Sequence, residues 1–111
     1  MTDSDDDYLR TTRADIALLP EPLASEAKVV DLGQAEWPRD MAEAVIRALI
    51  GLGRVVNVLE YARYRDGMLV EANPVSTYEG ASPEVNLSWI LPGVELLAED
   101  VSAIVSWHPG D

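Results

Sequence analysis

The stretch RVVNVLEYARYRDGMLVEANPV at residues 54–75 decides the fold, because it contains two extended runs on either side of Asp66–Gly67. An Asp-Gly pair between two apolar-rich runs is a strong sequence signal for a two-residue β-hairpin turn. A competing interpretation continues the preceding helix through Val55, Val56 and Leu59, which keep helical spacing. The two glycines just before the stretch and its valine-rich start oppose a helix, so we favour the hairpin.

The segment before this hairpin predicts the principal helix of the protein, over residues 38–51. Pro38 suits the first helical position, apolar residues follow with helical spacing, and Gly51 and Gly53 end the run. A second apolar row widens the hydrophobic face of this helix, and its members are Ala42, Ile46 and Ile50. A helix that is apolar over most of its circumference needs cover on two sides. The protein's own sheet can cover one side, and the other side needs either the N-terminal segment at 16–19 or another protein chain.

Two later segments, VNLSWIL at 85–91 and VSAIVSW at 101–107, alternate apolar and polar residues. Strict alternation is typical of antiparallel strands with one buried face. We therefore expect two strands with Trp89 and Trp107 on the buried face and the serines on the wet face. Each segment is followed by a Pro-Gly pair, which ends a strand.

These elements predict an α+β domain, in which one principal helix packs on a four- to five-stranded antiparallel or mixed sheet. A short helix is expected at 11–20 and a short strand at 28–32. If the strand at 28–32 lies beside the strand from residue 54, their crossover is parallel and right-handed. Residues 1–10 predict a disordered acidic tail, which leaves 11–111 as a single domain.

Charge is the strongest feature of the composition: 20 acidic residues face 8 basic ones, for a net charge of −12. Residues 71–111 carry seven acids and no lysine or arginine. Such a field repels nucleic acid and anionic membranes and attracts basic protein surfaces. Acidity also serves solubility alone, and that interpretation stays open.

The chain has no cysteine, an acidic N-terminus and no apolar run of about 18–20 residues. We therefore expect a cytoplasmic protein that does not contact membranes. Arginine greatly exceeds lysine and alanine is abundant, which is typical of GC-rich bacterial genomes and their phages.

Catalytic groups are sparse in this sequence. His108 is the only histidine, and Ser106 on the same strand face would lie roughly 6–7 Å away, too far for an activating hydrogen bond. Glu95 and Glu99, with Asp100 beside them, could act as acid and base or bind a metal, but a solvated face is the simpler interpretation. We expect no enzyme activity, no cofactor and no metal site.

The first functional hypothesis is a small, non-catalytic binding protein that inhibits or neutralises a basic protein partner. That partner could handle nucleic acid, as the targets of immunity proteins and phage-encoded inhibitors do. The candidate contacts lie in the acidic C-terminal half of the chain. They are Tyr78, Glu79, Glu84, Glu95, Glu99 and Asp100.

Two alternatives remain open. The chain could be an accessory or chaperone-like subunit of an oligomer, a homodimer included, assembled through the helix at 38–51 with Ala42, Ile46 and Ile50 at the interface. It could also be a small enzyme or metal protein that uses the carboxylates and His108.

Overall fold

The computed structural model describes residues 3–31, 33–80 and 82–109. Helices and strands follow one another along the chain in a mixed order, and η denotes a 3-10 helix. They are α1 (Asp3–Ala17), α2 (Leu23–Glu26), β1 (Lys28–Asp31), β2 (Gln34–Pro38), η1 (Arg39–Met41), α3 (Ala42–Gly51), β3 (Arg54–Arg65), β4 (Met68–Thr77), α4 (Pro83–Ile90), η2 (Leu91–Leu96) and β5 (Ser102–Pro109).

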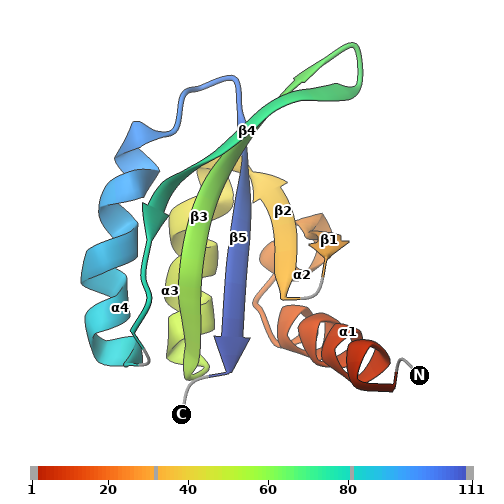
Figure 1. Cartoon of the computed structure of the whole chain (residues 1–111), viewed down its shortest axis with the longest axis vertical. Helices are drawn as coiled ribbons and strands as arrows, with labels where there is room; N and C mark the ends of the chain where they lie inside the picture. The colour runs from red at the N-terminus through yellow and green to blue at the C-terminus, as the bar shows by residue number, and fades with distance from the viewer. Residues whose placement is uncertain (1–2, 32, 81, 110–111) are drawn as a thin grey trace.

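The five strands form one sheet in the order β1-β2-β5-β3-β4, and every neighbouring pair is antiparallel. The last strand of the chain, β5, therefore lies at the centre between β2 and β3. Figure 1 shows α3 and α4 on one face of the sheet, with the opposite face turned to the viewer. The predicted α+β class, with a principal helix on an antiparallel sheet, is confirmed.

The hairpin that the sequence predicted at 54–75 is present as β3 and β4. Asp66 has φ 54° and Gly67 has φ 80°. Both values lie in the left-handed region that a type I′ hairpin turn requires, which glycine enters freely and aspartate more readily than most other residues. The far end of this hairpin extends beyond the helices, as Figure 1 shows.

The strand predicted at 28–32 is present as β1, but the condition for a parallel crossover to the strand from residue 54 is not met. β1 pairs with β2, not with β3, and the pairing is antiparallel. β2 was not predicted from the sequence, because this strand is short and ends in a proline. Gly33, with φ 63°, turns the chain back between β1 and β2.

The principal helix begins slightly later than predicted. Pro38 closes β2, the single turn η1 follows, and α3 runs to Gly51. Proline has a fixed φ that suits an extended strand end as well as a first helical turn, so the residue type alone did not separate the two.

The strand predicted at 85–91 was wrong, because this segment is the helix α4. Ser82 has an extended backbone, and Pro83 lies in the first turn, an arrangement typical of a helix start. The apolar residues of this segment recur both at every second position and at four-residue spacing, and the fold selects the helical period. Trp89, predicted to be buried, is 60% exposed. The strand predicted at 101–107 is confirmed as β5, with Trp107 buried and Ser106 half-buried.

The N-terminal helix is longer than the predicted segment 11–20, since α1 begins at Asp3. Residues 3–10, expected to belong to a disordered tail, have a helical backbone here, and residues 1–2 lie outside the described residues. Aspartates near a helix N-terminus suit the helix dipole. Within the described residues, no helix is both long enough and apolar enough to cross a bilayer.

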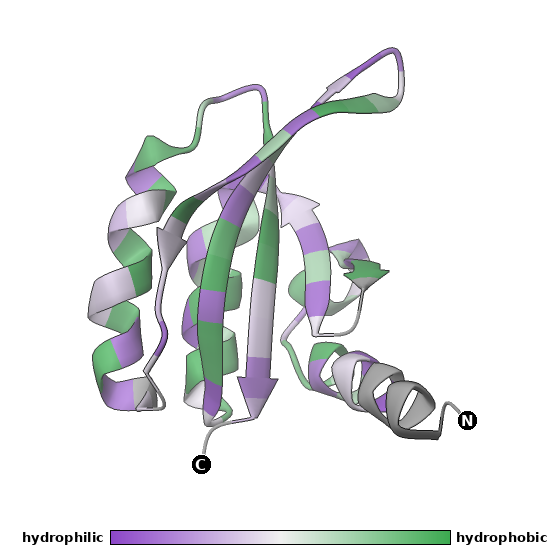
Figure 2. Ribbon diagram, in the orientation of Figure 1, coloured by the Kyte–Doolittle hydropathy of each residue, from purple (hydrophilic) through white to green (hydrophobic). Residues whose placement is uncertain are grey.

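The core lies between the sheet and the helices. Ile16 of α1 and Leu19, just after this helix, close one side of it, and Trp37 and Trp107 pack with ring centroids 6.1 Å apart. The indole N–H of Trp37 donates to the Leu23 carbonyl at 2.8 Å, so this large ring is buried without an unpaired donor. Figure 2 shows apolar segments along the strands and on α3 and α4.

Candidate functional site

Three faces of α4 carry three kinds of residue, and this division defines the candidate site. Asn86 and Ile90 point into the protein and are fully buried. Val85 and Trp89, four positions apart, are exposed. The third face, which includes Glu84 and Leu87, borders a groove against α3. The buried face anchors α4 in the core, and the other two faces are open to the solvent.

The groove between α3 and α4 has a volume of about 630 Å³. Its floor contains the apolar side chains of Leu87, Leu91 and Val94, and its rim is charged. The charged lining residues are Glu43, Arg47, Glu84 and Glu95. Because three carboxylates face one guanidinium, the rim has a net negative charge, and we call this feature the acidic groove.

Arg47 does not offset the charge of the far rim, because it pairs with its own helix neighbour. Arg47 Nε lies 2.9 Å from Glu43 Oε2, one helical turn away. Both side chains are more than half exposed, so the pair contributes little to stability. Glu84 and Glu95 on the α4 side therefore remain the uncompensated charges of the acidic groove.

A second hollow, of about 310 Å³, lies on the other side of α4. Tyr78, Glu79 and Trp89 line it together with Thr77 and Gly80. The Tyr78 and Trp89 rings lie 6.4 Å apart, and the Tyr78 hydroxyl donates to the Ser82 carbonyl at 3.1 Å. Tyr78 is therefore half-buried and holds the start of α4 against the end of β4.

The six predicted contact residues fall into three groups in the structure. Glu84 and Glu95 line the acidic groove, and Tyr78 and Glu79 line the hollow beside Trp89. Glu99 and Asp100 lie in the connection between η2 and β5, and both are exposed. The structure thus places four of the six around α4, while Asp100 has an arginine partner of its own.

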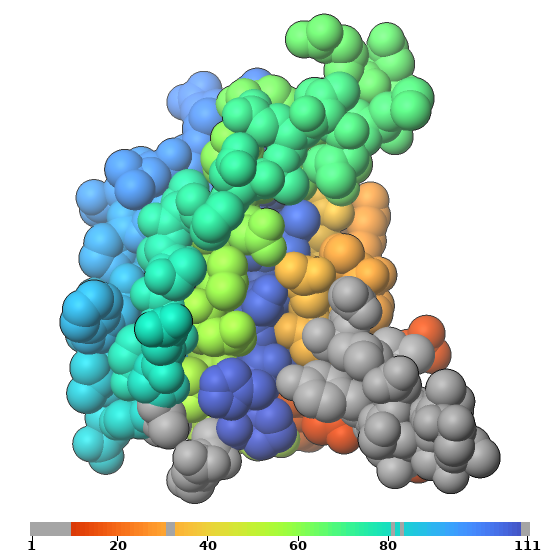
Figure 3. Space-filling model, viewed as in Figure 1, coloured from red at the N-terminus to blue at the C-terminus, as the bar shows by residue number. Residues whose placement is uncertain are grey.

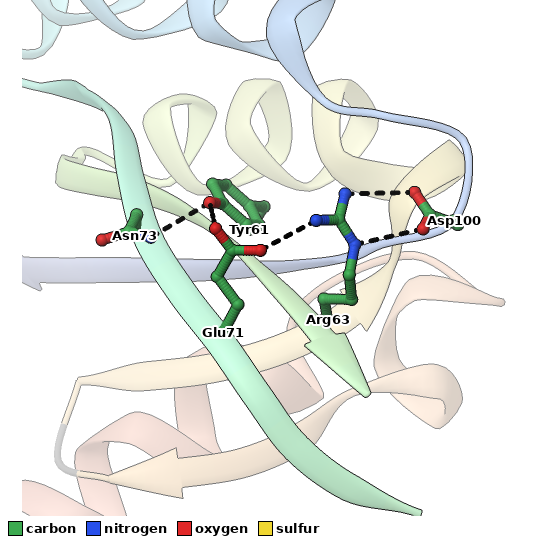
Figure 4. A network of polar contacts seen from close by, with 5 residues as sticks. All are labelled: Tyr61, Arg63, Glu71, Asn73 and Asp100. Carbon is green, nitrogen blue, oxygen red and sulfur yellow. Dashed lines mark hydrogen bonds and ion pairs between the residues drawn. The ribbon is translucent and has the colours of Figure 1, made fainter. Parts of the chain in front are cut away.

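That partner is Arg63, the centre of a polar network on the hairpin (Figure 4). Arg63 Nε and Nη2 donate to the two carboxylate oxygens of Asp100 at 3.1 and 3.3 Å, and Nη1 donates to Glu71 at 2.8 Å. The Tyr61 hydroxyl donates to the other Glu71 oxygen at 2.5 Å and accepts a hydrogen bond from Asn73 at 3.0 Å. Arg63 therefore ties the hairpin to the connection that precedes β5.

Replacing Arg63 by glutamine is expected to raise the pKa of Asp100. This pKa is now held below its ordinary value, chiefly by the hydrogen bond from Arg63 and secondly by a backbone hydrogen bond. Since the folded-state pKa lies below the unfolded one, the group stabilises the fold above the unfolded-state pKa. This contribution is lost as the pH falls through the folded-state pKa.

The measurement is an NMR titration of the Asp100 carboxyl carbon in the parent chain and the variant. Arg65→Gln removes the same charge from an exposed position on the same strand and is the control. An Asp100 titration that is identical in Arg63→Gln and in the parent chain would contradict the assigned pairing.

The residues predicted for an oligomer interface lie in the core of the protein or against it. Ala42 and Ile46 are fully buried within the chain, and Ile50 is partly buried against the same core. The sheet covers one side of α3, and α4 with η2 covers another. Both apolar sides of α3 are therefore covered by the same chain, and this helix does not require a second chain to cover it.

Ser106 and His108 do not contact each other in the way a nucleophile and its base would. Ser106 Oγ accepts a hydrogen bond from Gln34 at 3.1 Å, and His108 Nδ1 lies 2.8 Å from the Pro109 carbonyl oxygen. On the same face, Tyr64 donates to Glu36 at 2.8 Å. Burial, and then this hydrogen bond, raise the pKa of Tyr64. Among the described residues, no group of three or more potential ligands is placed to hold a metal.

Sequence reasoning missed Trp89, Glu43 and Arg47 as members of the surface around α4. Trp89 was missed because its segment was taken for a strand. The signal for the helix was present in Ser82-Pro83-Glu84, since a capping residue followed by proline and an acid is typical of a helix start.

The comparisons with known proteins return no match: no family model, no curated protein and no solved structure is similar to this chain. The fold and the site define an acidic α+β domain with an exposed helix that separates two surface hollows.

Proposed function

We propose that the chain is a non-catalytic binding protein that inhibits or neutralises a basic protein partner by holding it in the acidic groove. The observation that carries this proposal is an apolar groove with glutamates on its rim. An apolar floor supplies binding energy, and carboxylates at its edge select a basic segment and speed its association.

Trp89 supports the same proposal. It is a large aromatic side chain with 60% of its surface exposed, on the same helix as Glu84. Tryptophan is enriched among residues that dominate binding energy, because it buries a large area with little loss of conformational entropy. A partner that lies over α4 would cover Trp89 and enter the acidic groove at the same time.

The charge of the whole chain adds long-range attraction. At a net charge of −12, the protein draws basic surfaces toward itself, including surfaces that normally bind phosphates. A chain that occupies such a surface competes with nucleic acid for it. Cytoplasmic inhibitors of the immunity-protein or phage-encoded kind act in this way, and we assign the chain to that functional class.

Reversing the two uncompensated charges, in Glu84→Lys with Glu95→Lys, is expected to weaken partner binding about tenfold and to slow association. The matched control reverses Glu21 and Glu26, which are exposed near α2, away from the acidic groove. Both double variants change the net charge equally, so a general effect of charge would appear in both. The first measurement is comparative affinity purification from the source organism with the parent chain and both variants, and partners are identified by mass.

The second measurement uses the purified partner and follows the association rate and the change in tryptophan fluorescence, to which the exposed Trp89 contributes. A basic partner retained by the control and lost by the groove variant supports the proposal. Equal affinity of the two double variants for that partner would overturn it.

A further inference from the structure

The outer edge of β4 is the one strand edge of the sheet that combines length with an almost neutral surface. β4 ends the sheet on the side opposite β1. Its last part is covered: Ser76 Oγ donates to the Ile90 carbonyl at 2.9 Å, and a side chain at Gly93 would collide with Ser76. The part at 68–74 extends beyond α4 and η2, as Figures 1 and 3 show, and only Glu71 within it is half-buried and not fully exposed.

This free segment is apolar where it is most exposed. Met68 is 71% exposed, Leu69 is 54% exposed and Val70 is 53% exposed. Natural proteins usually protect such an edge with lysine, with other charges or with proline. Here the segment has no lysine, and its one proline, Pro74, is its last residue.

The segment is also close to electrically neutral. Its only charged residue is Glu71, and both oxygens of that carboxylate are engaged, one by Arg63 and the other by Tyr61. A basic partner thus finds no free negative charge on this edge, whereas it finds several around the acidic groove. An edge of this kind offers unpaired backbone groups and apolar side chains, and it fits another neutral, extended strand.

We propose that two copies of the chain pair antiparallel through residues 68–74 of β4 and form a dimer with one continuous sheet. The second copy is the occupant because it presents the same neutral strand with the same exposed apolar side chains. A two-fold axis brings this surface against itself and closes the assembly. Two chains of net charge −12 repel each other, and they approach at the least cost where neither carries uncompensated charge.

The dimer and the complex with a basic partner respond to salt in opposite directions. Salt screens the repulsion between two acidic chains, so dimerisation strengthens as ionic strength rises, whereas attraction to a basic partner weakens. This difference separates the two proposals, and either can fail without the other.

The test is sedimentation velocity over a range of concentrations, at about 50 mM and about 500 mM salt. The parent chain should be a monomer–dimer mixture with more dimer at high salt. Leu69→Lys with Val70→Lys places charge on the proposed interface and should raise the dimer dissociation constant at least about tenfold. These side chains are exposed, so circular dichroism should show an unchanged fold.

The matched control is Val29→Lys with Val30→Lys on β1, the opposite edge, where the two valines are 39% and 49% exposed. This variant adds the same charge and should dimerise as well as the parent chain. Hydrogen exchange should also show that amides in 68–74 gain protection as concentration rises. A parent chain that is monomeric at high salt, or a dimer lost in the β1 variant and retained in the β4 variant, would overturn the proposal.

Discussion

Replacing Asp15 by alanine is expected to lower the free energy of unfolding by about 3 kcal/mol. The Asp15 side chain is only 3% exposed. Its two oxygens accept hydrogen bonds from Arg54 at 2.8 and 3.0 Å, and one of them also accepts from the Trp107 indole at 2.9 Å. The carboxylate raises the pKa of Arg54, chiefly through its hydrogen bond. Alanine leaves a buried indole donor and a partly buried guanidinium without their acceptor.

The measurement is urea unfolding followed by the fluorescence of the buried tryptophans. The control is Asp40→Ala, which also removes an aspartate paired with an arginine, but one whose side chain is 88% exposed. A surface pair contributes roughly 0–1 kcal/mol, so the control should unfold close to the parent midpoint. If both variants shift the midpoint equally, Asp15 does not anchor α1 to the sheet.

Replacing Asn86 by leucine is expected to have an effect of similar size, about 3 kcal/mol. Asn86 is fully buried on α4 and binds the backbone of one strand residue twice. Its Oδ1 accepts from the Val56 amide and its Nδ2 donates to the Val56 carbonyl, both at 2.7 Å. The ladder between β3 and β5 shifts register between Val56 and Val58. Asn86 therefore forms hydrogen bonds with the Val56 amide and carbonyl where the strand is irregular. Leucine has no polar group that could replace these bonds.

The pH dependence of Asn86→Asp makes this prediction specific. An ionised aspartate keeps an acceptor for the Val56 amide but has no donor for the Val56 carbonyl. This variant should be strongly destabilised at neutral pH, and its deficit relative to the parent chain should shrink in acid, where the carboxyl gains a donor. Asn73→Ala, at an exposed position of β4, is the control and should change stability by about 0.5 kcal/mol or less. A pH-independent deficit for Asn86→Asp would contradict the role assigned to this side chain.

Part of the candidate site could be predicted from the sequence. The acidic C-terminal half pointed to Glu84 and Glu95, because charge distribution can be counted without a fold. The groove that these residues border could not be predicted, since it forms where α4 and η2 lie against α3, a helix far away along the chain. Trp89 was assigned to the wrong environment because successive side chains of a strand point to opposite faces, whereas those of a helix follow a period of 3.6 residues.

The sequence by itself determined the elements that depend on neighbouring residues. The Asp66–Gly67 turn follows from the backbone angles that these two residues tolerate, and α3 and β5 follow from apolar periodicity over their own length. The net charge and the absence of lysine and arginine from residues 71–111 also need no structure.

Only the tertiary structure decided features whose partners are far apart along the chain. Segment 85–91 satisfies both a helical and a strand period, and burial of Asn86 against β3 selects the helix. β5 is central because β2 and β3 both pair with it, which no local pattern reports. Asp15 and Trp107, 92 residues apart, meet because a buried carboxylate and a buried indole each require a hydrogen-bonding partner.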